Sequence, residues 1–247
     1  MNTLLQEYLI VPNWPAPDSI RALSTTRLGG VSSPPCDSLN MAEHVNDDPA
    51  CVSENRRILA ASAGYVTEPA WLKQVHGNQV IAAEEIRKLE TADATWTCKK
   101  GKPCVVMTAD CLPILLCDRF GTVVAAAHAG WRGLARGVIA ATVLRMGVAP
   151  EELLAWLGPA IGPLSFIIGD EVRAAILASD AGSIDCFRPS LGYWLADIYQ
   201  LARRQLSQLG VKAIFGGGFC TFSEVKRFFS YRREGQTGRM ASLIWLI

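Results

Sequence analysis

Histidine and cysteine are the residues most able to do chemistry in this chain, which has only three histidines. Two apolar runs, Leu112–Cys117 and Thr122–His128, flank a short segment that contains glycine, a pattern that predicts a β-hairpin. If the inner ends of these runs face each other across the turn, Cys111 lies opposite His128. Opposed residues project from the same face with Cβ atoms about 4.5–5.5 Å apart. That distance suits two ligands of one metal ion, or a thiol beside its base.

Charged residues surround this pair and favour a functional interpretation. A cysteine in an apolar strand is usually a small buried hydrophobe. Here Asp110 precedes Cys111, and Arg132 follows soon after His128. Burying such groups costs free energy unless they have partners, so we interpret the cluster as functional, with Asp110 as the candidate for proton transfer. His76 is expected at a strand end beside a Gly-Asn turn, a usual place for a functional side chain.

Arg27 is a candidate anion ligand because it directly precedes a Leu-Gly-Gly turn. Backbone amides in such turns can bind anions. A guanidinium group adds two parallel hydrogen bonds to a phosphate. Arg132 suits the same role.

The elements that carry these residues are mixed rather than alternating. A helix is predicted from the cap Asp48 to the stop at Gly64. Two more helices are predicted over Trp131–Met146 and Asp197–Leu209, and a last hairpin pairs Phe228–Arg233 with Arg239–Leu246. This mixture favours an α+β fold in a single domain spanning residues 1–247.

The composition excludes several function classes. The formal net charge is +1, with no basic block, so we expect neither nucleic acid nor a membrane surface as a partner. No apolar run has the length of a membrane span, and the first residues lack the features of a signal peptide. We therefore expect a cytoplasmic protein with no obligate protein partner. In that compartment the eight cysteines should be reduced thiols, and no disulfide should join Cys104, Cys111 and Cys117.

Several stretches together resemble one family. In order they are TTRLGGVS, SLN, QVHGNQV, VMTADCLPILLCD, AAAHAGWRGL, FFSYRR and TGRMAS. They look like the blocks of the laccase-domain family, whose members were named multicopper polyphenol oxidases and are described as purine nucleoside phosphorylases. The resemblance implies a layered sandwich of mixed sheets flanked by helices. It also implies a metal bound by His76, Cys111 and His128, and it matches Arg27 and Asn40 to further motif residues.

The main functional hypothesis is a zinc-dependent purine nucleoside enzyme. Two histidines and a thiolate with an open position match a catalytic zinc site. The resemblance implies phosphorolysis of adenosine, inosine, guanosine and methylthioadenosine, and adenosine deamination could use the same metal. Arg27 and Arg132 would bind phosphate, while Asn40 and Arg232 would contact substrate.

Three alternatives remain open. A single Cu²⁺ ion could occupy the same ligands and oxidise phenols, but only His44 would be left for any further copper. Cys111 could instead be a metal-free nucleophile with His128 as its base, as in a Cys–His hydrolase. The protein could also bind nucleosides without turnover.

Overall fold

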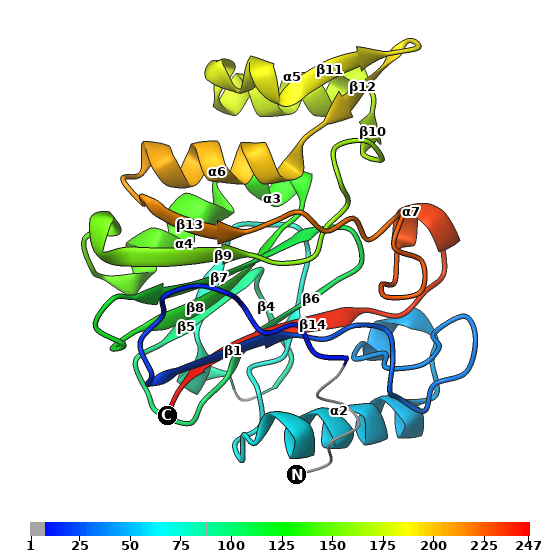
Figure 1. The fold of residues 1–247 in the computed structure, drawn as a ribbon, viewed down its shortest axis with the longest axis vertical. Helices are drawn as coiled ribbons and strands as arrows, with labels where there is room; N and C mark the ends of the chain where they lie inside the picture. Colours follow the sequence, from blue (N-terminus) through cyan, green and yellow to red (C-terminus); the bar gives the residue numbers. More distant parts are fainter. Residues whose placement is uncertain (1–7, 87) are drawn as a thin grey trace.

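Two β-sheets pack face to face, and helices cover the outer face of each sheet (Figure 1). The structure, a computed structural model, describes residues 8–86 and 88–247. The resulting α–β–β–α sandwich belongs to the α+β class that the sequence predicted. Residues 1–7, which the signal-peptide prediction concerned, lie outside the described residues. In the described part of the chain, none of the helices combines the length and apolar character that crossing a membrane requires.

The larger sheet is mixed and has the strand order β13-β9-β7-β8-β5-β3. Its strands are β3 (Val80–Ala82), β5 (Ala94–Thr97), β7 (Leu112–Asp118), β8 (Val124–Ala129), β9 (Leu153–Leu157) and β13 (Ala213–Gly216). The helices that pack on its outer face are α3 (Trp131–Ala135), α4 (Val138–Met146) and α6 (Ile198–Gln208). Apolar side chains from this face and these helices form the largest core cluster.

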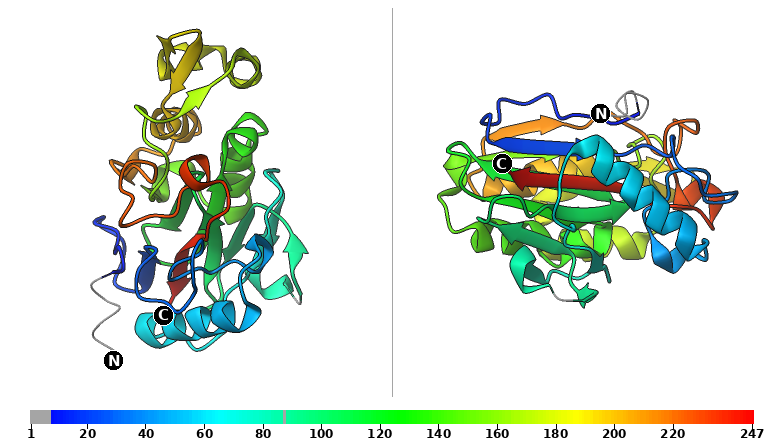
Figure 2. Two further views of the ribbon diagram at one scale, coloured as in Figure 1. Left: turned by 90° about the vertical axis from the view of Figure 1, so that its right-hand side faces the viewer. Right: turned by 90° about the horizontal axis from the view of Figure 1, so that it is seen from below.

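The smaller sheet is antiparallel, with the order β1-β14-β6. Its strands are β1 (Ile20–Ser24), β6 (Cys104–Thr108) and β14 (Met240–Leu246), and helix α2 (Pro49–Ala63) lies against its outer face (Figures 1 and 2). Shorter elements complete the described fold. They are β2 (Leu72–Lys73), β4 (Glu90–Thr91), β10 (Ile167–Ile168), α5 (Asp170–Ser179), β11 (Phe187–Ser190), β12 (Tyr193–Ala196), α7 (Tyr231–Glu234), and 3₁₀ turns at Glu43–Val45, Ala83–Glu85, Pro150–Glu152 and Ala181–Cys186.

The central hairpin forms as predicted, but its register differs by two residues. β7 and β8 pair with Pro113 opposite His128, so Cys111 does not face His128 directly. The cause is a longer loop, because the Asp118 carboxylate accepts hydrogen bonds from the Thr122 amide at 2.7 Å and the Val123 amide at 3.1 Å. A shift of two residues keeps every side chain on its predicted face, whereas a shift of one would have reversed them.

The alternation of side chains along this hairpin decides to which face of the sheet His128 points. In β7, Leu115 and Cys117 pack between the two sheets, and in β8 Ala126 does the same. His128 follows Ala126 by two residues and therefore shares its face. The imidazole is thus directed into the space between the sheets, at the end of the strand.

Helix α2 confirms the predicted caps. The Asp48 side chain accepts a hydrogen bond from the Ala50 amide at 2.9 Å, and Gly64 ends the helix with a φ of 76°. The predicted helix over residues 131–146 is wrong in one respect, since it divides into α3 and α4. Gly137 lies between them with a φ of 79°, a left-handed conformation that an α-helix does not contain.

The predicted last hairpin is also wrong in its first half. β14 forms, but residues 228–233 contribute helix α7 and no strand. Side chains bond the amides that a strand would have used: Ser230 Oγ accepts from the Arg233 amide at 3.2 Å, and the Asp110 carboxylate accepts from the Arg232 amide at 2.6 Å. Phe228 and Phe229 are fully buried beneath this turn.

Candidate metal centre

Cys111 and His128 reach the site from neighbouring strands of the larger sheet. His128 is the penultimate residue of β8 and is almost fully buried. Cys111 directly precedes β7 and follows Asp110, whose φ of 89° turns the chain sharply. Such a backbone conformation is uncommon for a residue other than glycine, and residues held in sparsely populated conformations cluster at functional sites.

His76 comes from a turn that a single buried carboxylate holds in place. Asp93 accepts hydrogen bonds from three successive amides, those of Val75 at 3.2 Å, His76 at 2.8 Å and Gly77 at 2.6 Å. His76 itself has a φ of 59°. Asp93 also accepts from Nδ1 of His128 at 2.8 Å. One carboxylate, with no exposed surface, therefore orients both histidines.

The three side chains converge on one point. Cys111 Sγ lies 3.7 Å from His76 Nε2, and the ligating atoms of His76, Cys111 and His128 all lie within 4.8 Å of one another. The two imidazoles meet edge to face, with centroids 4.7 Å apart. Gly130 makes this approach possible, because a Cβ at that position would lie 2.9 Å from both Cys111 Sγ and His76 Cδ2.

The surroundings favour a thiolate at Cys111. Burial by itself would raise the pKa of this thiol, but the charge of His128 and hydrogen bonds from both histidines lower the pKa below its ordinary value. Burial would likewise lower the pKa of His128, but Cys111 and Asp93 raise it. Thiolate is the form of cysteine that binds metals and attacks electrophiles.

These residues fit a zinc or copper ion. A thiolate and two imidazoles are the donors that both metals accept. When His128 is neutral, the bond to Asp93 keeps the ring proton on Nδ1, so the Nε2 lone pair can bind a metal, the arrangement typical of carboxylate–histidine–metal sites. Three protein ligands leave a coordination position open, as in catalytic zinc sites. In the described part of the chain, this is the single group of three or more His, Cys, Asp or Glu side chains placed to hold an ion.

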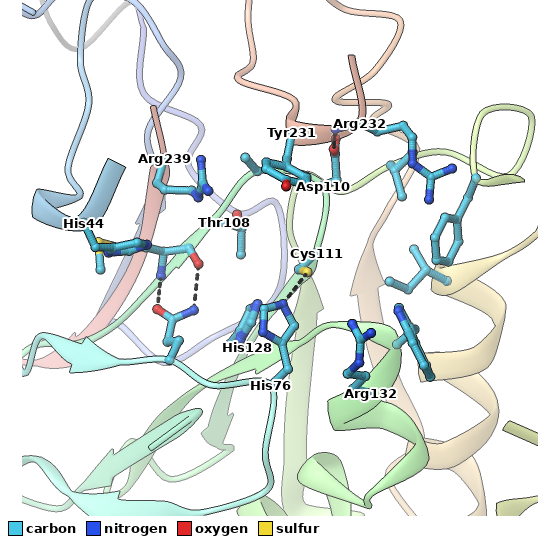
Figure 3. Close-up of a pocket in the computed structure, with 17 residues that line it drawn as sticks. His44, His76, Thr108, Asp110, Cys111, His128, Arg132, Tyr231, Arg232 and Arg239 are labelled. Atoms are coloured by element: carbon cyan, nitrogen blue, oxygen red, sulfur yellow. Dashed lines mark hydrogen bonds between the residues drawn. The ribbon is translucent and has the colours of Figure 1, made fainter. Parts of the chain in front are cut away.

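A pocket of about 450 Å³ opens above the cluster (Figure 3). This volume lies in the range of roughly 300–1,000 Å³ typical of small-molecule sites. Figure 3 shows Arg239 and His44 on one side of the His–Cys–His cluster and Arg132 and Arg232 on the other. Trp131 and Phe166 lie on the side of Arg132 and Arg232, whose guanidinium groups are 4.3 and 5.7 Å from the respective ring centres, and Ile161 and Ile198 add further apolar lining to the pocket.

Four of the charged or polar residues selected from sequence have defined places around this pocket. Arg132 lines it, with its guanidinium 4.3 Å from the ring centre of Trp131. Arg232 also lines it and donates to the Ile167 carbonyl. Asp110 lines it too, but both its carboxylate oxygens are engaged, one by the Arg232 amide and one by Thr221 Oγ1 at 2.6 Å. His44 lines it without joining the His–Cys–His cluster.

Arg27 and Asn40 are not among the residues that line the pocket. Arg27 donates to Glu234 at 2.8 Å and to Asp37 at 3.3 Å, so its fork is already occupied by carboxylates. The Asn40 amide is fully buried and fully hydrogen-bonded, and its oxygen accepts from the Arg239 amide at 2.9 Å. Both motif residues thus support the segment between α7 and β14 rather than projecting into the pocket.

Sequence reasoning missed two residues that the structure makes prominent. Asp93 was assigned no role from the sequence, and only its burial and its hydrogen bonds mark it as important. Arg239 was placed at the start of the last strand without a role. The one available signal for Arg239 was its position in the TGRMAS stretch.

The fold and the site together define a class of protein. The chain belongs to the laccase-domain family, because residues 21–247 match the family described as multi-copper polyphenol oxidoreductase laccase. This confirms the resemblance seen in the sequence blocks.

Curated relatives and solved structures agree with this membership. The chain is 56% identical over 239 residues to Purine nucleoside phosphorylase PA4543 of Pseudomonas aeruginosa, covering 96% of this chain and 98% of that one. It is 54% identical over 240 residues to Purine nucleoside phosphorylase YfiH of Escherichia coli, covering 97% and 99%. Among solved structures, protein NMB0706 of Neisseria meningitidis superposes with a TM-score of 0.94 at 46% identity, covering 97% and 99% of the two chains.

Proposed function

We propose that this protein is a zinc-dependent purine nucleoside phosphorylase of the cytoplasm. Its substrates would be adenosine, inosine, guanosine and methylthioadenosine together with inorganic phosphate. The names of its relatives support this assignment. The observation that carries it is the His76–Cys111–His128 cluster at the floor of a pocket large enough for a small ligand.

The apolar side of the pocket suits the purine base. Trp131 and Phe166 line it, and aromatic rings bind flat heterocycles through their faces and edges. Arg132 and Arg232 lie beside these two rings, at 4.3 and 5.7 Å from the respective ring centres. Their guanidinium groups can donate hydrogen bonds to the acceptor atoms of a purine. We assign both arginines to substrate binding on this side.

Phosphorolysis exchanges one bond at C1′ of the ribose. A phosphate oxygen forms a bond to C1′ while the bond from C1′ to the purine nitrogen breaks, and the base leaves with that electron pair and takes up a proton. A bound metal would supply a Lewis acid at the pocket floor. The protein's own contribution is to hold both reactants in line and to exclude water.

Asp110 is assigned a positioning role. Its two carboxylate oxygens bond the Arg232 amide and the Thr221 hydroxyl, so it ties helix α7 to the start of β7. That link places Arg232 at the pocket. The proton-transfer role expected for Asp110 from its position in the sequence would weaken this link whenever the carboxylate takes up a proton.

Adenosine deamination is the second reaction that we assign to the same site. Zinc deaminases use mixed histidine and cysteine ligands with a water nucleophile. Deamination does not use phosphate, so it should be observed at zero phosphate concentration.

Copper oxidation is less well supported. Multicopper chemistry needs several metal sites, and within residues 8–86 and 88–247 only one cluster has the ligands for an ion. A metal-free cysteine nucleophile has a specific observation in its favour, because Asp93, His128 and Cys111 form a carboxylate–imidazole–thiol series.

One experiment separates these functions. Protein purified without added metal is analysed for zinc and copper, and then assayed with adenosine and inosine with and without phosphate. We expect zinc, phosphate-dependent release of base, and loss of both activities after chelation and in Cys111→Ser. Activity that survives chelation would favour the cysteine nucleophile, and activity that follows copper loading and ignores phosphate would favour the oxidase. Zinc-loaded protein that releases no base at any phosphate concentration would refute the phosphorylase assignment.

A further inference from the structure

Arg239 is held rigidly at the wall of the pocket. It directly precedes β14, and its guanidinium Nη1 donates to the carbonyls of Thr237 at 2.7 Å and Gly238 at 3.0 Å. Its amide donates to Asn40 Oδ1 at 2.9 Å, and its carbonyl accepts from the Met41 amide at 3.1 Å. Backbone and side chain are therefore both fixed, which reduces the entropy lost when a ligand binds.

The charge of Arg239 lacks a protein counter-ion. Other arginines that are at least partly buried pair with carboxylates, namely Arg27, Arg56, Arg204 and Arg233. Arg173 and Arg203 form no ion pair among the described residues either, but neither of them lines the pocket. Among the described residues, Arg239 forms no such ion pair, and its Nε and Nη2 groups make no hydrogen bond to protein. Burial lowers the pKa of Arg239, as expected for a charge that is partly removed from water and has no carboxylate partner.

The two negative groups that act most strongly on Arg239 already have other partners. Cys111 and Asp110 are the first two groups whose charge favours the cation at Arg239. The Asp110 carboxylate bonds Thr221 and the Arg232 amide, and Cys111 belongs to the metal cluster. A thiolate bound to a metal has most of its charge neutralised. The fork of Arg239 is therefore best satisfied by an anion that enters the pocket.

The other pocket arginines are less suited to this task. Arg132 and Arg232 are exposed, and solvent weakens the attraction of an exposed charge for an anion. They also lie on the apolar side of the cluster, whereas Arg239 lies on the opposite side together with Thr108 and His44 (Figure 3). The pocket thus has one side suited to a flat apolar ring and one suited to an oxyanion.

From this arrangement we infer that Arg239 is the anchor of an oxyanion subsite that binds inorganic phosphate on the side of the metal cluster opposite the purine. The inference rests on the proposed function for its choice of phosphate. It assigns Arg27 no direct contact with phosphate. Asn40 acts through Arg239, as a positioning residue that holds the backbone of the anchor.

Two variants of Arg239 test this subsite. Arg204→Gln is the control, because it removes one positive charge that does not line the pocket and that pairs with Asp180. Direct binding of inorganic phosphate is measured by calorimetry on zinc-loaded protein without nucleoside. In parallel, the KM for phosphate is measured with inosine, and the rate of adenosine deamination is measured without phosphate. Circular dichroism and zinc content verify that each variant is folded and loaded.

In Arg239→Gln we expect phosphate affinity to fall and the KM for phosphate to rise by about 30-fold or more, the effect of losing a charge-assisted fork. Arg239→Lys keeps the charge but loses the fork, so it should recover part of this loss. Deamination should fall much less than phosphorolysis, and Arg204→Gln should stay within about twofold of wild type in every measurement.

The outcomes separate this inference from the proposed function. If folded, zinc-loaded Arg239→Gln binds phosphate within about threefold of wild type, the inference is wrong while phosphorolysis stands. If the wild-type protein binds phosphate through Arg239 but releases no base, the subsite stands and the proposed function fails. A wild-type protein that binds no phosphate would overturn the subsite.

Discussion

Replacing Asp93 by asparagine tests whether one carboxylate organises the metal centre. Oδ1 of Asp93 accepts from the His76 amide and from His128 Nδ1, and Oδ2 accepts from the amides of Val75 and Gly77. Asparagine has the same shape but only one acceptor oxygen. Whichever way its amide is oriented, two of these donors would face an NH₂ group.

The magnitude follows from those orphaned donors. Leaving a buried donor unsatisfied costs about 1–3 kcal/mol, so two of them should lower the free energy of unfolding by about 2–6 kcal/mol. That is a large part of the roughly 5–15 kcal/mol typical of a folded protein. In one orientation of the asparagine amide the His76 amide and His128 Nδ1 lose their acceptor, and in the other the turn that carries His76 loses two hydrogen bonds. In both cases metal affinity should fall, by about 10- to 100-fold, as is usual when the partner of a ligating histidine is removed.

Asp118→Asn is the matched control. Asp118 is also fully buried, and it accepts from the Thr122 amide, the Thr122 hydroxyl and the Val123 amide at the turn of the β7–β8 hairpin, whereas Cys111 and His128 lie at the opposite end of that hairpin. An asparagine oxygen can keep both amide hydrogen bonds while its NH₂ group donates to the Thr122 hydroxyl, so this replacement should lower stability less and leave the candidate metal centre unchanged.

Unfolding is followed in urea on metal-free protein, and zinc affinity is measured by competition with a chelator. Co²⁺ is used as a spectroscopic probe, because its thiolate charge-transfer and d–d bands report the ligand set of the folded site. We expect Asp93→Asn to bind both metals weakly with altered bands, and Asp118→Asn to match wild type. If folded Asp93→Asn binds zinc as tightly as Asp118→Asn, the reasoning is refuted.

Three further predictions concern the surroundings of the site. Gly130→Ala should reduce zinc affinity at least about tenfold in chelator competition. The backbone φ of −68° at this position suits alanine, but the added Cβ would crowd Cys111 and His76. A variant with normal zinc affinity would contradict this packing. Arg27→Ala should lower the free energy of unfolding by about 1–3 kcal/mol, because Glu234 and Asp37 lose their charged partner. It should change the KM for phosphate less than Arg239→Gln does. If it raises that KM more than Arg239→Gln does, Arg27 is the phosphate ligand. Burial would raise the pKa of Glu234, but hydrogen bonds from Thr237, Arg27 and Arg233 hold the pKa at about 2, below the ordinary 4.5. Its stabilisation should therefore be complete above pH 4.5 and be lost as the pH falls toward 2, and Glu234→Gln should lack this acid-dependent loss in unfolding curves.

The metal cluster was largely predictable because its clues are local. The alternation of side chains along two strands placed Cys111 and His128 on one face of a hairpin, and a two-residue error in register did not change that face. The family resemblance added His76, which the structure brings to the same cluster. The caps of α2 depend only on residues at its ends, and they too were predicted correctly.

What the sequence could not determine is which partners distant residues find. Arg27 has the chemistry of a phosphate ligand, but Glu234 reaches its guanidinium from 207 positions along the chain. Arg239 has the same chemistry and, among the described residues, meets no carboxylate. Asp93 and Asp118 are equally buried, yet only Asp93 contacts two candidate ligands. The sequence alone sets the type of each side chain. Whether a charged side chain is free to bind a ligand depends on which groups the packed fold places within hydrogen-bonding distance of it, and only the tertiary structure decides that.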